Sequence, residues 1–162
     1  MPASPPCSSA SRSVPVAAEP GAAPLTVEEH NTALILDGYR RWSESGGASV
    51  EHWLDMAADD ISLQLLGDIG GPAPARGKAA LRAYLGAVND HWRMLAYDVT
   101  ETIAQGERVV AIIDSAWLNR HTGQTGRLRM VNIWRIRDGR AVEFTEFYDT
   151  ALAMAAAQGP PR

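Results

Sequence analysis

The stretch that decides the fold is RLRMVNIWRIRDGRAVEFTEFY, residues 127–148, in which two alternating runs flank the pair Asp138-Gly139. One set of alternate positions in the first run is apolar with a single exception: Leu128, Met130, Asn132, Trp134 and Ile136. The second run has the same pattern: Val142, Phe144, Glu146 and Tyr148. Alternation of this kind indicates strands with one buried face, and Asp-Gly is typical of a tight turn. The stretch therefore predicts a β-hairpin with an apolar inner face.

Two polar residues, Asn132 and Glu146, interrupt the apolar positions of this hairpin. A plain two-residue turn would put them on opposite faces of the sheet. A three-residue turn, with Gly139 in the left-handed conformation, pairs Ile136 with Arg140 and brings both apolar faces to one side. We expect this second register, because a strand pair buries its apolar residues together. Asn132 and Glu146 would then be diagonal neighbours, about 7–8 Å apart at the backbone.

An amide and a carboxylate on an apolar face are costly unless they bond each other, water or a ligand. Two interpretations are open. In the first, the pair is sealed together in a closed core; in the second, it lines a pocket to which Tyr39, Trp117 and Tyr148 add further polar-tipped aromatic side chains. The pocket is the interpretation on which any chemistry depends.

The rest of the chain divides into helices followed by strands. The amphipathic periodicity predicts three helices, at residues 26–44, 49–57 and 78–92. A strand is predicted between the second and third helix, at residues 61–65. Two further strands, 94–104 and 108–118, precede the hairpin, and their short links require antiparallel neighbours. Helices first and strands afterwards indicate an α+β fold, here a curved antiparallel sheet wrapped by three N-terminal helices around an apolar pocket.

The ends of the chain differ in composition from this domain. Residues 1–25 are rich in Pro, Ala and Ser and are expected to form a disordered tail. The domain should span residues 26–157, leaving 158–162 as a flexible C-terminus, and 162 residues suit one domain. The Gly- and Pro-rich segment 67–77 is expected to be a loop that could act as a lid over the pocket.

Composition excludes several classes of partner. The net charge of −4 argues against nucleic acid or an anionic membrane surface, both of which demand a basic patch. No segment approaches the roughly 18 apolar residues of a membrane span. The single cysteine, Cys7, is consistent with a reducing, cytoplasmic location. The four histidines lack metal-ligand spacing, so we expect neither a metal nor another cofactor.

Four motifs, in their order and spacing, resemble the nuclear transport factor 2-like superfamily and, within it, the SnoaL-like and ketosteroid-isomerase-related proteins. They are AADDI at 57–61, ARGKAAL at 75–81, WRIRDGR at 134–140 and EFTEFYDT at 143–150. The resemblance spans residues 26–157. It implies a cone-shaped fold, a homodimer formed through the sheet, and a pocket for a small hydrophobic molecule.

The resemblance also implies roles for particular residues. The tyrosine and the acidic residue with which ketosteroid isomerases stabilise an oxyanion fall on Tyr39 and Asn132, and asparagine can still donate a hydrogen bond. The general base of those isomerases should lie on the strand at 61–66, where this chain has Leu63 and Leu65, so authentic steroid isomerisation is not expected. The acid of the related epoxide hydrolases falls on Glu146.

These implications define the expected site. Tyr39, Asn132 and Glu146 would be catalytic, with Glu146 as general acid and base in acid–base proton transfer on a small carbonyl, enol or epoxide compound. The expected pocket residues are Trp42, Leu63, Leu65, Tyr84, Ser115, Trp117, Met130, Trp134, Phe144 and Tyr148. The alternative is a binding or dimerisation module without catalysis. Asp114 and His121 match acidic and histidine positions of related enzymes, but the strand pattern favours an outward Asp114 and a turn-exposed His121.

Overall fold

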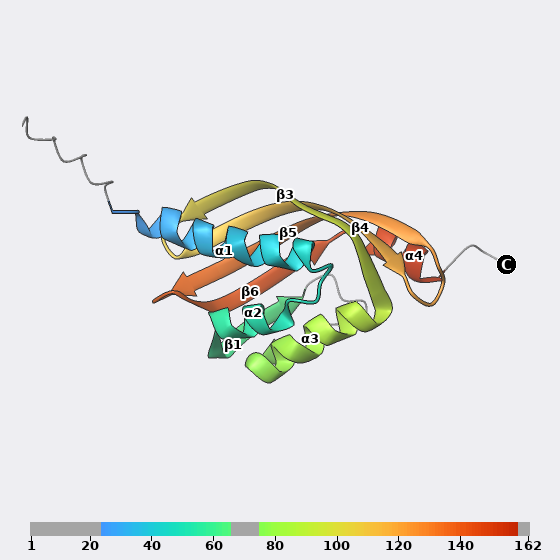
Figure 1. The fold of residues 1–162 in the computed structure, drawn as a ribbon, viewed down its shortest axis with the longest axis horizontal. Helices are drawn as coiled ribbons and strands as arrows, with labels where there is room; N and C mark the ends of the chain where they lie inside the picture. The colour runs from blue at the N-terminus through green and yellow to red at the C-terminus, as the bar shows by residue number, and fades with distance from the viewer. Residues whose placement is uncertain (1–23, 66–74, 159–162) are drawn as a thin grey trace, which may run out of the picture.

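The computed structural model describes residues 24–65 and 75–158 (Figure 1). These residues form four helices and six strands, in the order α1 (Val27–Glu44), α2 (Val50–Met56), β1 (Ala57–Leu65), β2 (Ala75–Arg76), α3 (Lys78–His91), β3 (Trp92–Gln105), β4 (Arg108–Asn119), β5 (Thr125–Arg137), β6 (Arg140–Tyr148) and α4 (Thr150–Gln158). Most of the predicted tail, of the predicted flexible C-terminus and of the 67–77 loop lies outside the described residues.

The strands form one curved sheet in the order β2-β1-β6-β5-β4-β3. The predicted antiparallel meander is present from β3 to β6, but β1 pairs with β6 in parallel, with Leu63 opposite Phe144. The sheet is therefore mixed rather than antiparallel. A parallel neighbour is possible here because a long stretch of chain, including α3 and the four strands β2 to β5, separates β1 from β6. The expected α+β fold is confirmed, and residues 75–76 of the expected loop form the short edge strand β2.

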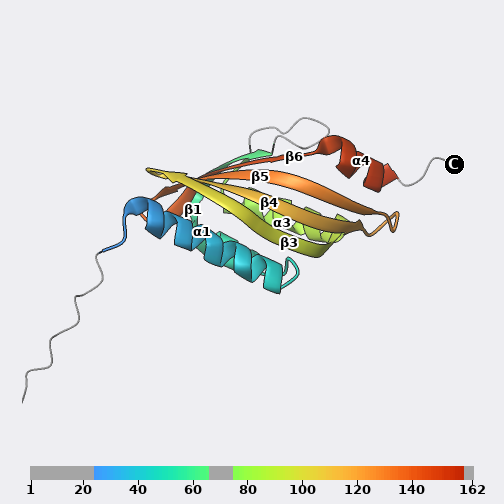
Figure 2. The ribbon, with the colours of Figure 1, turned by 90° about the horizontal axis from the view of Figure 1, so that it is seen from above.

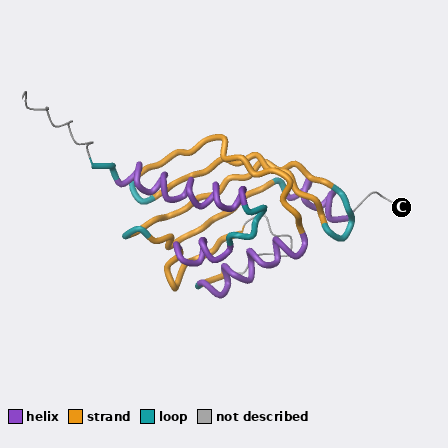
Figure 3. The backbone as a smooth tube through the Cα atoms, viewed as in Figure 1, coloured by secondary structure: helices purple, strands orange, loops and turns teal. Residues whose placement is uncertain are grey.

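The first helix begins where the sequence predicts it. Thr26 accepts a hydrogen bond from the Glu29 amide at 3.2 Å, while the Glu29 carboxylate accepts one from the Thr26 amide at 2.8 Å. This reciprocal capping box satisfies backbone donors that the helix start would leave unpaired. The helices α1, α2 and α3 cover the inner face of the sheet (Figure 3), and α4 packs against β5 and β4 at the end of the sheet remote from the start of α1 (Figure 2).

The register of the β5–β6 hairpin differs from the prediction. Arg137 pairs with Arg140 across a two-residue turn, in which Asp138 and Gly139 have φ of 50° and 71°. Positive φ at both central residues is the type I′ geometry that Asp-Gly favours, so the predicted three-residue turn is wrong. The apolar faces still coincide, because a bulge in β6 takes up one extra residue, Val142.

The bulge brings the two polar residues closer than expected. Ile136 pairs with Ala141 and Arg135 with Glu143, so Asn132 lies directly opposite Glu146 rather than diagonal to it. Directly opposed residues of antiparallel strands have Cβ atoms about 4.5–5.5 Å apart. The predicted common face of Asn132 and Glu146 is therefore present, although the bulge in β6 produces it and not a three-residue turn.

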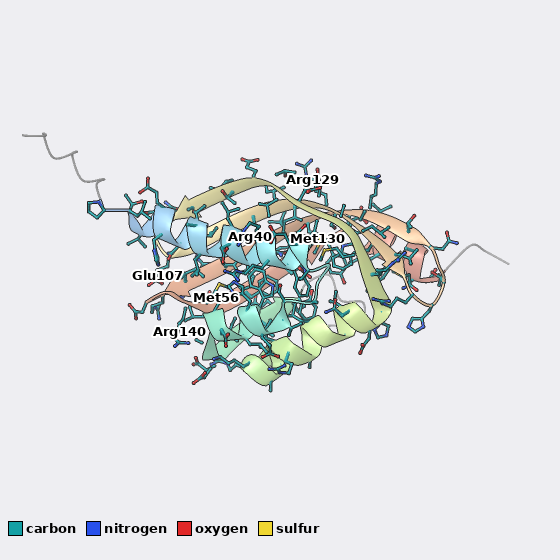
Figure 4. The ribbon with its side chains drawn as sticks, viewed as in Figure 1. Arg40, Met56, Glu107, Arg129, Met130 and Arg140 are labelled. Atoms are coloured by element: carbon teal, nitrogen blue, oxygen red, sulfur yellow. The ribbon has the colours of Figure 1, made fainter. Side chains whose placement is uncertain are left out.

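The two faces of the sheet differ in character. On β5, the side chain of Met130 turns into the layer between helices and sheet, whereas its neighbour Arg129 points away from it (Figure 4). The inner layer holds most of the core, including Ile35, Trp53, Leu63 and Ile113. Within residues 24–65 and 75–158, none of the helices has the length and hydropathy that crossing a bilayer requires.

Gly38 in α1 provides a test of this packing. A Cβ at Gly38 would lie 2.7 Å from the ring of Trp53, which cannot retreat because it stacks on Trp134 at 5.1 Å between centroids. We expect Gly38→Ala to lower the free energy of unfolding by about 1–3 kcal/mol, as overpacking does. Urea denaturation measures the change.

The matched control is Gly86→Ala in α3, where an added Cβ meets nothing within 4 Å. Helix propensity alone should then raise the free energy of unfolding by about 0.5–1 kcal/mol. A Gly38→Ala variant as stable as Gly86→Ala would contradict the close approach of α1 to Trp53.

Candidate functional site

A cavity of about 370 Å³ lies between the inner face of the sheet and the helices. A volume of this size is within the usual range for small-molecule sites. Its walls are mostly apolar and aromatic, and Tyr39, Asn132 and Glu146 all reach them. The sequence pattern left open a closed core or a pocket, and the structure has a pocket.

The carboxylate of Glu146 is the only acidic group on the described walls of this cavity, and it is 4% exposed. Tyr84 of α3 donates its hydroxyl hydrogen to Oε1 of Glu146. The amide of Asn132 faces Oε2 from the opposite strand. Hydrogen bonds to an ionised acceptor are about twice as strong as those between neutral groups, so these donors offset part of the cost of burying the carboxylate.

The orientation of the Asn132 amide follows from its neighbours. With Nδ2 toward Glu146, the amide donates to Oε2 at 3.1 Å and to the backbone oxygen of Val131 at 3.3 Å, while Oδ1 accepts from the Tyr39 hydroxyl at 2.8 Å. The opposite orientation would set the amide oxygen against the carboxylate, acceptor against acceptor. The indole of Trp134 donates to the Tyr39 oxygen at 2.8 Å. A chain of hydrogen bonds therefore runs from Trp134 through Tyr39 and Asn132 to Glu146.

Burial raises the pKa of Tyr39, Tyr84 and Tyr97, so these three tyrosines stay protonated at neutral pH. Burial, and then the charge of Glu146 and the hydrogen bond to it, raise the pKa of Tyr84 well above its usual range. Burial raises the pKa of Tyr97 too, followed by the influence of Tyr39 and Glu146. The Tyr97 hydroxyl lies 3.5 Å from the side-chain amide of Asn132, at the position that Oδ1 takes in the orientation given above, so its hydrogen bond there is long. Tyr97 is thus a weakly engaged O–H donor on the cavity wall.

The structure places most predicted pocket residues on the cavity wall. Those at the wall are Trp42, Tyr84, Trp117, Met130, Trp134, Phe144 and Tyr148. Leu63 and Leu65 are instead in the buried core, because β1 lies beyond β6. Ser115 lies below the wall, where its hydroxyl accepts from the Trp117 indole at 3.0 Å and lies 3.1 Å from the Leu128 carbonyl, to which it donates.

The two residues of uncertain orientation are outside the cavity. Asp114 is on the outer face, with its side chain 59% exposed and 3.7 Å from Arg129. His121 is exposed in the turn after β4, and its ring centroid lies 5.3 Å from that of His91 at the end of α3. Among the described residues, no three His, Cys, Asp or Glu side chains gather as a metal site would require.

Sequence reasoning missed several residues of the cavity, above all Trp53, Trp92 and Tyr97. Strict alternation along β3 could not locate Tyr97, because the β3–β4 register shifts between Met94 and Ala96. Trp53 belongs to the helix predicted at 49–57, but the sequence pattern cannot show whether an apolar helix face packs in the core or lines a void, because that depends on how the helices pack. The aromatic side chains of the helices were the one feature of the sequence that could have indicated these cavity residues.

Fold and cavity together define a class: small α+β proteins whose bent sheet and helices enclose a pocket that carries an acid. Residues 39–144 match the model of the SnoaL-like domain, and the chain belongs to that family. The comparison with curated proteins returned no match.

Solved structures share the fold. An NTF2-like protein from Burkholderia xenovorans LB400 is 24% identical, with 80% of this chain and 96% of that chain covered and a TM-score of 0.67. A candidate SnoaL-like polyketide cyclase from Jannaschia sp. CCS1 is 18% identical over 87% of this chain and all of the other, with a TM-score of 0.72. An NTF2-like protein of unknown function from Burkholderia pseudomallei K96243 is 25% identical, covering 77% and 95%, with a TM-score of 0.64.

The contact between Asn132 and Glu146 can be tested by Asn132→Asp. The substitution replaces a donor with a second carboxyl group, and two such groups in contact cannot both ionise easily. One carboxyl group of the pair then binds its proton more tightly in the folded than in the unfolded protein. The free energy of unfolding, measured in urea, should be about 1–3 kcal/mol below wild type at pH 7. The deficit should shrink as the pH falls toward about 4, the usual carboxyl range.

Asn119→Asp is the matched control. Asn119 is also buried, but its Oδ1 accepts from the backbone amides of His121 and Thr122 at 3.0 Å, a role that a carboxylate can keep. This variant should stay close to wild type at pH 7. Equal, pH-independent effects of the two substitutions would contradict the Asn132–Glu146 contact.

Proposed function

We propose that this protein is an enzyme that transfers protons, without a cofactor, on a small and largely apolar carbonyl, enol or epoxide compound. The observation that carries the proposal is the position of Glu146, whose carboxylate lies at the wall of an aromatic cavity between donors from α3 and β5. A carboxylate held in a water-poor site is one of the groups with which enzymes move a proton to or from carbon or oxygen.

For a carbonyl compound, the proposed step begins with the Glu146 carboxylate taking a proton from the carbon next to the carbonyl group. The electrons of the broken C–H bond form an enolate, and the protonated Glu146 returns the proton to another carbon or to the same one. The negative charge that develops on oxygen needs a donor already in place. Tyr97 suits this role, because its hydroxyl is buried, protonated and only weakly engaged at 3.5 Å.

Tyr39 and Asn132 take a role different from the one that the family resemblance implied. The Tyr39 hydroxyl donates to Asn132, and the Asn132 amide donates to Glu146. Because these donors are already engaged within the protein, neither residue is the best candidate to donate to a substrate oxygen. We assign both to positioning: they fix the orientation of the carboxylate, and Trp134 fixes that of Tyr39. Such supporting hydrogen bonds hold a reacting group within the narrow geometry that catalysis needs.

The test is exchange of carbon-bound hydrogen for deuterium. The protein is incubated in D₂O with β-tetralone and with a β,γ-unsaturated cyclohexenone, and proton NMR follows both exchange and double-bond migration. We expect the wild-type protein to accelerate exchange for at least one ketone. Glu146→Gln should lower the rate by about a hundredfold or more, as loss of a general base does.

Glu143→Gln is the control, because Glu143 is the neighbouring acid on β6 but pairs with Arg135 at 2.9 Å. This variant should exchange at the wild-type rate. Undiminished exchange by folded Glu146→Gln would reject the assignment of Glu146. Ketone binding by the wild-type protein without any exchange would favour the alternative, a binding module.

We also propose a homodimer through the outer face of the sheet. The centre of that face is apolar, where Ile112 and Phe147 flank Val131 on adjacent strands, and the ion pairs Asp114–Arg129 and Arg135–Glu143 border it. An apolar centre with a charged rim is typical of an interface.

Light scattering after size-exclusion chromatography tests the dimer. Wild type should elute as a dimer and Val131→Lys as a folded monomer, because a charge would be buried at the interface centre. Leu36→Lys is the control, since it replaces an exposed apolar residue of α1, which lies on the other face of the sheet. A monomeric wild type, or a dimeric Val131→Lys, would exclude this interface.

A further inference from the structure

The aromatic side chains of this protein are concentrated in one place. The chain has five tryptophans, four tyrosines and two phenylalanines, and all of them except Phe147 line the cavity. The tryptophans come from every side of it: Trp42, Trp53, Trp92, Trp117 and Trp134. Aromatic faces carry partial negative charge, and tryptophan attracts cations most strongly of the three.

The charge of the cavity has the same sign. Its described walls carry one acidic side chain, that of Glu146, and no lysine or arginine. His91 is the one histidine among the described wall residues, and it is exposed to solvent. Tyr84 and Asn132 are neutral donors, so their hydrogen bonds leave the charge of the carboxylate in place. Walls of one sign and low dielectric focus the field in the space between them.

We infer that the cavity binds a small organic cation, a substituted ammonium group that lies among the aromatic rings and near Glu146. A neutral apolar ligand would gain from contact with the rings but not from the carboxylate. An inorganic cation would lose its hydration without the oxygen ligands that it needs, since Glu146 is the one carboxylate among the described residues of the wall. An alkylated ammonium, which is weakly hydrated, suits both rings and acid.

The inference concerns the charge of the ligand and does not depend on proton transfer. Choline and 3,3-dimethylbutan-1-ol, called dimethylbutanol below, provide a matched pair of probes. The two molecules have nearly the same shape, but dimethylbutanol has a carbon atom where choline has its charged nitrogen. Tryptophan fluorescence reports occupancy directly, since all five indoles line the cavity. We expect choline to bind wild-type protein about tenfold more tightly than dimethylbutanol, the gain typical of a partly desolvated cation–π site.

Glu146→Gln should reduce this preference severalfold while leaving dimethylbutanol binding unchanged, and Glu143→Gln should keep the wild-type preference. Equal affinities, tighter binding of the neutral probe, or no detectable choline binding would overturn the inference. The comparison of the two probes on wild-type protein decides the matter even if Glu146→Gln does not fold. A lost choline preference with retained deuterium exchange refutes only the cation site. A retained choline preference without deuterium exchange refutes only the proposed proton transfer.

Discussion

The cross-strand pair of Asn132 and Glu146 is the contact around which the rest of the site is arranged. Burying a carboxylate costs several kcal/mol, so it persists in a core only with bonded partners of good geometry. The bulge in β6 sets the amide directly opposite the acid, and α3 brings Tyr84 to the other carboxylate oxygen. Tyr39 then fixes which way the amide points. The strands β5 and β6 and the helices α1 and α3 thus all contribute to a single hydrogen-bonded unit.

The helices complete the cavity and do more than cover the sheet. α1 supplies Tyr39 and Trp42, α2 supplies Trp53, and α3 supplies Tyr84, so the walls exist only when all three helices are docked. The docking is tight where Gly38 admits the ring of Trp53 against α1. Stacked and edge-on ring contacts hold several of these side chains in fixed positions, as in the contact of Trp134 with Phe144 at 4.3 Å.

Function on this fold is decided by the site, because related folds serve enzymes and binding proteins alike. An acid among aromatic rings can move a proton, and the same arrangement attracts a cationic group. The two properties make different demands on a ligand: the first requires an acidic C–H bond or a reactive oxygen, the second requires positive charge. A single substrate that meets both demands would use Glu146 first to orient the molecule and then to react with it.

The sequence by itself determined the α+β order of elements, the strands of the meander, the capped start of α1 and the presence of an amide and an acid on one apolar face. These features follow from local periodicity and turn chemistry, which act over a few residues. Only the tertiary structure decided the mixed sheet, the bulge that restores the common face, the void beside Glu146, and the inward position of Tyr97. A bulge shifts a register without changing the pattern of residues, and a cavity depends on distances between elements far apart in the chain.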